Sequence, residues 1–247
     1  MTAFTRSDDL QTATFTDVNL SGARFVRCDL SAVILRAADV SGADIDAPWL
    51  LAGDDTLLVN GVNVAPFVDA ELNRRFPGRE LRLADTPEAL RTAWAAVERA
   101  WSTITDQVAA MPPGTEDISV DGEWSFAQTL RHLVMATDTW FGRAILRIEQ
   151  PYHPIGQPHA EYETDGEDMS VFATTKPPYD EVLAVRADRV TQVRDFLAAL
   201  TPAELAAARQ HPRAPEYPET VLSCLHTILE EEWEHLRYAT RDLATLS

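Results

Sequence analysis

Two side chains near the end of the chain, Glu231 and His235, have the residue types and the spacing of metal ligands. They belong to the segment 220–247, which has apolar residues at helical spacing: Val221, Leu225 and Ile228. Residues four apart share one face of a helix, so this stripe continues into Glu231, His235 and Tyr238. A carboxylate or an imidazole buried alone is costly, whereas a metal ion is a partner for both. The pair therefore points to a metal site.

A metal site on one helix needs a further ligand from a helix that faces it. His132 is the candidate, because it lies at the edge of the apolar side of an earlier predicted helix. From the residue types alone, a buried His–Glu–His hydrogen-bond network without a metal fits equally well.

Two further side chains of the last helix have ligand chemistry. His226 lies nine residues before His235, which places it on the opposite helix face, so we expect it at the surface or in an interface. Glu232 lies three residues before His235 and is the closer rival of Glu231. A spacing of four keeps Glu231 nearer the apolar stripe, and we therefore favour Glu231 as the ligand.

Three earlier segments share this helical periodicity and, with the last helix, predict a four-helix bundle. They span about 86–111, 125–148 and 178–200. Thr86 before Pro87 is an expected N-cap, and Ser125 with Gln128 forms an expected capping box. The link at about 150–178 is longer than an ordinary loop of a compact domain, so we expect it to have a structural or functional role.

The segments TLRHLVMATDTWF and LHTILEEEWEHLRYA resemble the DinB-like superfamily, and the resemblance covers about 84–247. It implies a mainly α fold, an up-down four-helix bundle that holds a metal through one His of the second helix and an H-x3-H pair of the last. His132 and His235 match the first and last of these positions, and Glu231 stands where the family has its other His. A His-Glu-His set belongs to the mycothiol-dependent branch of the superfamily.

The ligand set that this resemblance implies fits zinc, because two imidazoles, one carboxylate and an open water position make up catalytic zinc sites. Nickel, manganese and iron accept the same ligand types. Such a metal lowers the pKa of a bound water or thiol towards neutrality. The resemblance thus implies a thiol S-transferase that uses a metal-bound thiolate or water, with mycothiol as co-substrate, on a small electrophilic molecule. A metal-dependent hydrolase of the same fold is the alternative.

Other side chains are candidates for the surroundings of the metal. Arg186 lies on the inward stripe of the third helix, where it would pair with Glu231 or an acidic neighbour, or hold an anionic group of the substrate. Tyr238 continues the ligand face, while Asp138 and Trp140 would line a pocket or, for the Trp, belong to the core. Three ring side chains of the long link would form a lid or lie in a solvated loop: Tyr152, His153 and His159.

The first fifty residues carry a different pattern, an apolar residue at every fifth position. These residues are Leu10, Phe15, Leu20, Phe25, Leu30, Leu35, Val40 and Ile45. A period of five fits neither a helix nor a plain strand and indicates a solenoid. The run resembles the pentapeptide repeat, which implies a right-handed β-helix with four quintets per coil, here two coils. So short a solenoid is expected to pack on the rest of the chain.

We therefore expect three parts: the repeat at 1–47, a cap and linker at 48–83, and the bundle at 84–247. Within the linker, Asn60-Gly61 predicts a hairpin and Pro66 opens a short helix. The linker would cover strand edges at the open end of the solenoid.

Composition indicates a soluble globular protein, with 45% hydrophobic and 24% charged residues. The net charge of −18 argues against sequence-independent binding to nucleic acid or to an anionic membrane. Cys28 and Cys224 make no disulfide framework, so a reducing cytoplasm is expected. We expect neither a signal peptide nor a membrane-spanning segment.

Two readings other than an enzyme follow from the repeat. Acidic pentapeptide-repeat proteins mimic DNA, but residues 1–50 hold seven Asp against four Arg, and two coils are too short to imitate a duplex. Alternatively, the repeat is a packing module for the bundle or the contact of a homodimer.

Overall fold

The computed structural model describes residues 3–5, 7–51, 55–160, 162–164 and 166–246. The chain divides into two compact units, Met1–Asp46 and Ala47–Ser247. We call them the repeat unit and the helical unit. The predicted cap and linker, residues 48–83, lies within the helical unit, which begins at residue 47.

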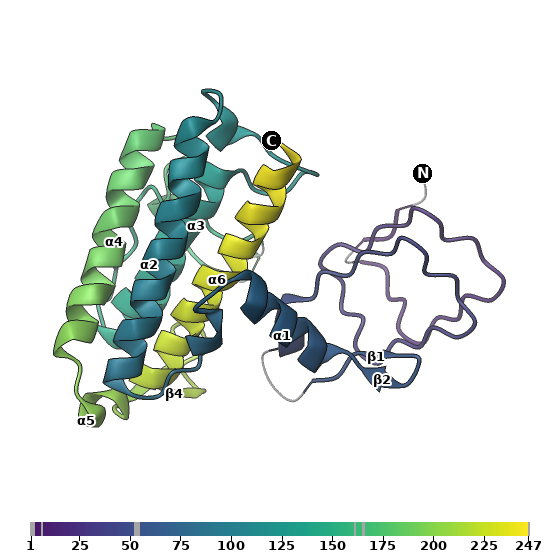
Figure 1. Ribbon diagram of the computed structural model, residues 1–247, viewed down its shortest axis with the longest axis horizontal. Helices are drawn as coiled ribbons and strands as arrows, with labels where there is room; N and C mark the ends of the chain where they lie inside the picture. Colours follow the sequence, from purple (N-terminus) through teal and green to yellow (C-terminus); the bar gives the residue numbers. More distant parts are fainter. Residues whose placement is uncertain (1–2, 6, 52–54, 161, 165, 247) are drawn as a thin grey trace. The chain divides into compact units, whose positions relative to one another are not determined.

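Four long helices make up the body of the helical unit (Figure 1). They are α2 (Pro87–Ala110), α3 (Phe126–Thr137), α4 (Tyr179–Ala199) and α6 (Val221–Thr245). α3 continues as a π-helical segment, η4 (Asp138–Ile145). Both α2 and α3 pack against α4 and α6, so α2 and α3 occupy opposite corners of the bundle. Most of the core between them is apolar: Leu90, Trp94, Leu130, Leu133, Val193 and Trp233 are buried.

The predicted helix starts are confirmed. The Thr86 side chain accepts the backbone N–H of Ala89, and Ser125 and Gln128 form both hydrogen bonds of a capping box. α6 begins with a second capping box, between Thr220 and Ser223. These caps satisfy backbone groups that have no partner within the helix, and they fix where α2, α3 and α6 begin.

The predicted up-down alternation of the bundle is wrong, because α3 and α4 run in the same direction. Asp138 contacts Arg189, and further along both helices Phe141 packs on Phe196. α2 and α4 run oppositely, since Arg91 near the start of α2 donates to the carbonyl of Leu197 near the end of α4. The order is therefore up, down, down, up. The long link makes this order feasible, because it returns the chain along the bundle between α3 and α4.

The remaining elements are short. They are η1 (Pro48–Leu51), β1 (Leu58–Val59), β2 (Val62–Asn63), α1 (Ala65–Arg75), η2 (Arg79–Leu81), η3 (Thr115–Asp117), η5 (Met169–Val171), α5 (Pro202–Leu205), β3 (Ala208–Gln210) and β4 (Pro218–Thr220). The strands form two antiparallel pairs, β1 with β2 and β3 with β4. The hairpin predicted at Asn60-Gly61 is confirmed, with positive φ angles of 51° and 81° at its two turn residues.

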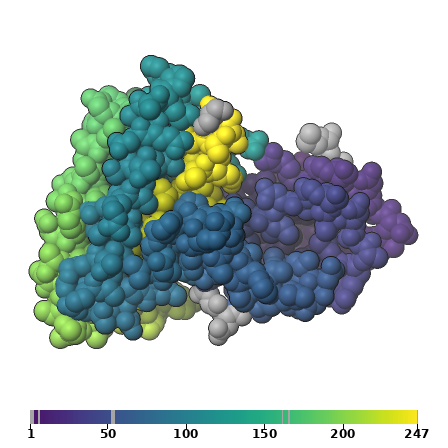
Figure 2. All heavy atoms as spheres, viewed as in Figure 1, coloured from purple at the N-terminus to yellow at the C-terminus, as the bar shows by residue number. Residues whose placement is uncertain are grey.

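Residues 65–84, which we call the α1–η2 segment, lie against α6 through charged groups. Arg79 is 1% exposed and donates to Asp69 at 2.7 Å, and its guanidinium also lies 3.9 Å from Glu234. Arg82 contacts Asp69 at 2.9 Å and Glu230 at 3.4 Å. Figure 2 shows the atoms of this segment against those of α2 and α6.

The repeat unit has a turn at every fifth residue. Positive φ angles recur at Thr12, Asp17, Gly22, Arg27, Ala32, Ala37 and Gly42. Its described residues contain no strand, and the eight apolar residues at fivefold spacing remain 44–66% exposed. Two coils give each side chain a stacking neighbour on one side only. The described residues thus show the period of the predicted right-handed β-helix but not its hydrogen-bonded ladders.

No helix within the described residues has the length and apolar character needed to cross a membrane. Cys28 is exposed, Cys224 is buried, and neither forms a disulfide.

Gly78 offers a test of how closely the α1–η2 segment packs on α2. Its φ is +101°, and a Cβ atom there would lie 2.5 Å from the Cβ of Ala96. We expect Gly78→Ala to lower the free energy of unfolding by about 2–5 kcal/mol, from the left-handed backbone and from overpacking. Urea unfolding followed by tryptophan fluorescence measures this, because all six tryptophans lie in the helical unit.

Gly114→Ala is the matched control. Gly114 has a φ of +92° but no atom within 4 Å of an added Cβ, so it should carry the backbone cost of about 1–2 kcal/mol alone. Equal losses in the two variants would contradict the close packing at Gly78.

Candidate metal centre

Three side chains from two helices converge at one point in the bundle. His132 comes from α3, and Glu231 and His235 come from α6, each with one ligand atom within 4.8 Å of the others. Glu231 Oε2 lies 3.5 Å from His132 Nε2 and 3.4 Å from His235 Nδ1. The two imidazole rings stack with their centroids 4.7 Å apart. The residues that the sequence singled out as metal ligands are thus neighbours in space.

Both imidazoles are oriented by backbone carbonyls. His132 Nδ1 lies 2.9 Å from the carbonyl oxygen of Gln157, and His235 Nδ1 lies 2.9 Å from that of Glu231. A carbonyl oxygen only accepts, so each Nδ1 carries the proton and each Nε2 keeps its lone pair for a metal. Metal-binding histidines usually donate their second ring nitrogen in this way.

The charges of the centre also suit a cation. Partial burial opposes ionisation of Glu231, but the two imidazoles and Arg213 outweigh it and lower its pKa to about 2. Burial, and next the neighbouring His132, lower the pKa of His235 to about 4. At neutral pH Glu231 is therefore an anion and His235 a neutral base, which are the states that bind a metal. The donor set fits a divalent metal ion.

Two aromatic rings flank the imidazoles. The Trp124 ring lies 4.6 Å from that of His132 and 6.2 Å from that of His235. Tyr238 meets His235 edge-on, with centroids 5.7 Å apart, as its place on the ligand face suggested. Trp124 was not predicted from the sequence, because it precedes the N-cap of α3 and has no helical spacing to any candidate ligand. Its position just before the capping box was the available signal.

Glu232, the alternative to Glu231 as a metal ligand, lies in the core of the bundle and not in the candidate metal centre. It is 1% exposed and forms an ion pair with Arg186, which is itself 5% exposed and lies over the Trp101 ring. Burial raises the pKa of Glu232 above its ordinary value. Of the roles considered for Arg186, the ion pair with an acidic neighbour is the one seen. The buried stripe of α6 therefore runs through Glu232, and Glu231 and His235 lie at its border.

His226 is also placed away from the centre. It is half-buried, and its Nε2 lies 2.8 Å from the carbonyl oxygen of Ala84 in the α1–η2 segment. This contact is on the face of α6 that carries Glu230 and Glu234, as expected from the spacing of nine to His235.

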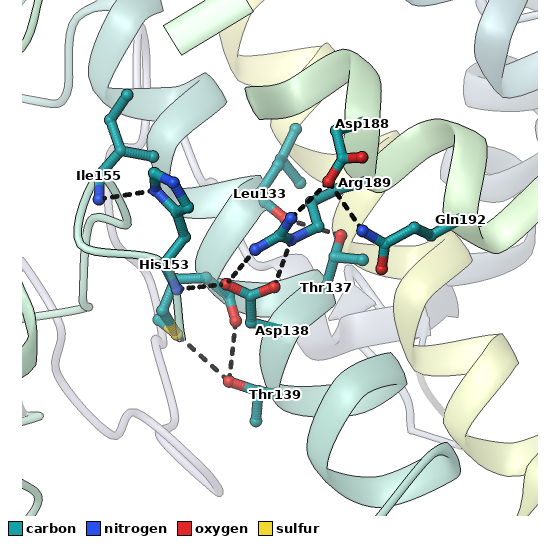
Figure 3. Close-up of polar contacts among 10 residues, drawn as sticks. Leu133, Thr137, Asp138, Thr139, His153, Ile155, Asp188, Arg189 and Gln192 are labelled. Atoms are coloured by element: carbon teal, nitrogen blue, oxygen red, sulfur yellow. Dashed lines mark hydrogen bonds and ion pairs between the residues drawn. The ribbon is translucent and has the colours of Figure 1, made fainter. Parts of the chain in front are cut away.

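Asp138, considered as pocket lining, joins three segments (Figure 3). Its carboxylate accepts Arg189 Nε of α4 at 2.5 Å and the backbone N–H of His153 at 2.8 Å. Burial raises the pKa of Asp138, with Arg189 acting in the opposite direction. Trp140, the other candidate, packs edge-on against His211 with ring centroids 5.0 Å apart. Asp138 thus fixes the start of the long link to α3 and α4.

The long link is docked on α3 and is not a solvated loop throughout. Tyr152 belongs to a second apolar cluster: Met135, Tyr152, Tyr162 and Phe172. Arg131 Nε donates to the carbonyl of Ile155, and the Gln157 N–H donates to the carbonyl of Arg131. His159 lies 2.9 Å from Arg213 Nη1. The link therefore holds the carbonyl that orients His132.

Comparison with known proteins agrees with both resemblances. A family model described as the DinB superfamily matches residues 89–239. A second model, pentapeptide repeats, matches eight copies over residues 9–46. No curated protein and no solved structure matches the chain.

The Arg186–Glu232 pair predicts a strongly non-additive response. Arg186→Met should lower the free energy of unfolding by about 3–5 kcal/mol, because it leaves a buried carboxylate without its partner. Adding Glu232→Leu should restore most of this loss, and a double-mutant cycle from urea unfolding measures the coupling. A double variant as unstable as Arg186→Met would contradict the pairing. Arg194→Met, which breaks the exposed contact with Glu98, should cost at most about 1 kcal/mol.

Metal content tests the centre directly. We expect elemental analysis of the purified protein to find a divalent metal that His132→Ala and His235→Ala both lose, because each removes one of three ligands. His226→Ala is the matched control, a histidine of the same helix on the opposite face, and should retain the metal. Equal metal in the parent and both ligand variants would refute the site.

Proposed function

The chain belongs to the DinB superfamily, and on this premise we propose that its helical unit is a metal-dependent thiol S-transferase. The observation that carries the proposal is the convergence of His132, Glu231 and His235 on one point. Catalytic zinc sites have three protein ligands and one open coordination position, whereas structural zinc sites have four protein ligands.

In this proposal the three side chains would hold a divalent ion, zinc in the first place and nickel, manganese or iron as alternatives. When bound, the ion supplies a Lewis acid that lowers the pKa of a coordinated thiol or water. The Gln157 carbonyl holds His132 with its Nε2 turned to Glu231, and the Glu231 carbonyl accepts from His235 Nδ1. Trp124 and Tyr238 exclude water from two sides of the imidazoles.

The co-substrate in this proposal is a low-molecular-weight thiol of the mycothiol type, and the acceptor is a small electrophilic molecule. Support comes from the His-Glu-His ligand set, which the mycothiol-dependent branch of the superfamily shares. A cytoplasmic setting, in which thiols stay reduced, is part of the proposal. The repeat unit, proposed as a short β-helix, would serve as a packing or self-association module.

Conjugate formation tests the proposed reaction. Zinc-loaded protein is incubated with mycothiol and monobromobimane, and the thioether product is followed by mass spectrometry. We expect catalysis by the parent and by His226→Ala, and the uncatalysed rate with His235→Ala, because the ligand variant cannot hold the metal. Metal-dependent cleavage of an ester without any thiol, together with no conjugate, would replace the transferase by the alternative hydrolase.

A further inference from the structure

The long link is attached to the bundle near its start by a buried carboxylate, that of Asp138. This side chain is 4% exposed and begins the π-helical segment η4, directly after α3. Its Oδ1 accepts Arg189 Nε of α4 at 2.5 Å, and its Oδ2 accepts the backbone N–H of His153 at 2.8 Å (Figure 3). One carboxylate thus holds the link against two elements of the bundle.

From this anchor the link runs back along α3 towards the metal centre. Ile155 is buried, and its carbonyl accepts Arg131 Nε at 2.8 Å. Two residues later, the Gln157 N–H donates to the carbonyl of Arg131 at 3.1 Å, and the Gln157 carbonyl lies 2.9 Å from His132 Nδ1. Residues 153–157 therefore contact α3 and its continuation at every second residue, from the anchor to the candidate ligand.

This short segment also holds its own shape. His153 Nδ1 accepts the backbone N–H of Ile155 at 3.2 Å, and the His153 carbonyl accepts that of Gly156 at 3.0 Å. A Cβ atom on Gly156 would lie 3.2 Å from the Cβ of Met135 on α3, so the backbone packs closely here. A displacement at His153 is therefore passed on through these contacts to the carbonyl of Gln157.

The two imidazoles of the candidate centre differ in what orients them. His235 Nδ1 lies 2.9 Å from the carbonyl of Glu231, a residue of the same helix. His132 Nδ1 lies against a carbonyl of the link, which is a different segment of the chain. The hydrogen bond of one ring nitrogen decides which nitrogen carries the proton. The tautomer of His132 therefore depends on where the link is held.

We propose that Asp138 is a positioning residue of the metal centre that acts through the link. It fixes His153, and the Gln157 carbonyl at the far end of the same segment then holds His132 for the metal. Outer groups that fix a metal ligand in this way typically contribute roughly 10–100-fold to metal affinity. This inference rests on the proposed function, since it concerns how that metal centre is assembled.

The first test is the tautomer of His132 in the metal-free full-length protein, followed by NMR of the ¹⁵N-labelled imidazole rings. In the parent, His132 and His235 should both carry the proton on Nδ1. Asp138→Ala should remove this preference at His132, because the link loses its anchor, and should leave His235 unchanged as an internal reference. An equal change at both rings would mark a general loss of structure and overturn the positioning role.

Asp138→Asn separates the anchor from the ion pair with Arg189. Its amide oxygen still accepts the backbone N–H of His153, whereas the charge is lost. The His132 tautomer should therefore remain as in the parent, although the protein unfolds at lower urea concentration. Asp188→Ala, which removes the exposed carboxylate beside Arg189 Nη1, should not change the tautomer. If Asp138→Asn alters His132 as Asp138→Ala does, or if Asp138→Ala leaves it unaltered, the positioning role is overturned.

Zinc affinity of the same variants is measured by competition with a chromophoric chelator. Asp138→Ala should bind zinc about tenfold more weakly than the parent, and Asp138→Asn as tightly as the parent. The double variant Asp138→Ala/Arg189→Met also removes the cation that the lost carboxylate had paired, so its stability in urea should recover. Its zinc affinity should stay low, because the link still lacks its anchor.

Two outcomes separate this inference from the proposed function. Zinc affinity that recovers together with stability in the double variant would overturn the role of Asp138, and the metal centre would stand. If the parent binds no zinc, the proposed function fails, while the His132 tautomer in the metal-free protein still decides whether Asp138 positions that ring.

Discussion

The structure of the helical unit depends on one turn of α6 in which four carboxylates each need a partner. Burying a carboxylate without one is costly, and three neighbouring segments supply cations or an imidazole to this turn. The α1–η2 segment brings Arg82 to Glu230 and Arg79 towards Glu234. α3 brings His132 to Glu231, and α4 brings Arg186 to Glu232. Successive side chains of a helix point about 100° apart. The four carboxylates therefore face different neighbours, and the three segments pack around this part of α6.

The consequence for chemistry is that adjacent carboxylates have different electrostatic environments. Burial raises the pKa of Glu230 and of Glu232, whereas the imidazoles and Arg213 lower that of Glu231 to about 2. Of these three carboxylates, Glu231 is the one whose pKa is lowered, and its side chain keeps 30% of its exposure. The candidate ligand is thus distinguished by its surroundings, since its residue type is the same as that of its neighbours.

Local sequence patterns predict much of this structure, whereas the long-range partners could not be predicted from them. The caps at Thr86 and Ser125 and the apolar stripes depend on residues within a few positions of one another, so the helix positions could be predicted. Spacing favoured Glu231 over Glu232 as the candidate ligand. The partner of Arg186 comes from another helix, so spacing could not show that Glu232 is that partner. The repeat unit shows the same contrast between local and long-range structure. Its turns at every fifth residue depend on nearby residues, whereas hydrogen-bonded ladders depend on neighbouring coils, and a unit of two coils has few of them.

The direction of the helices connects the fold to the site. Since α3 and α4 run in parallel, the chain must return along the bundle before α4 begins, and a buried return path must satisfy its own backbone groups. The link does so by hydrogen bonds to α3, and one of its carbonyls, that of Gln157, finds its donor in the imidazole of His132. A simple alternation with short loops would leave that ring without this partner. The topology that the sequence did not predict therefore supplies the contact that turns His132 Nε2 towards Glu231.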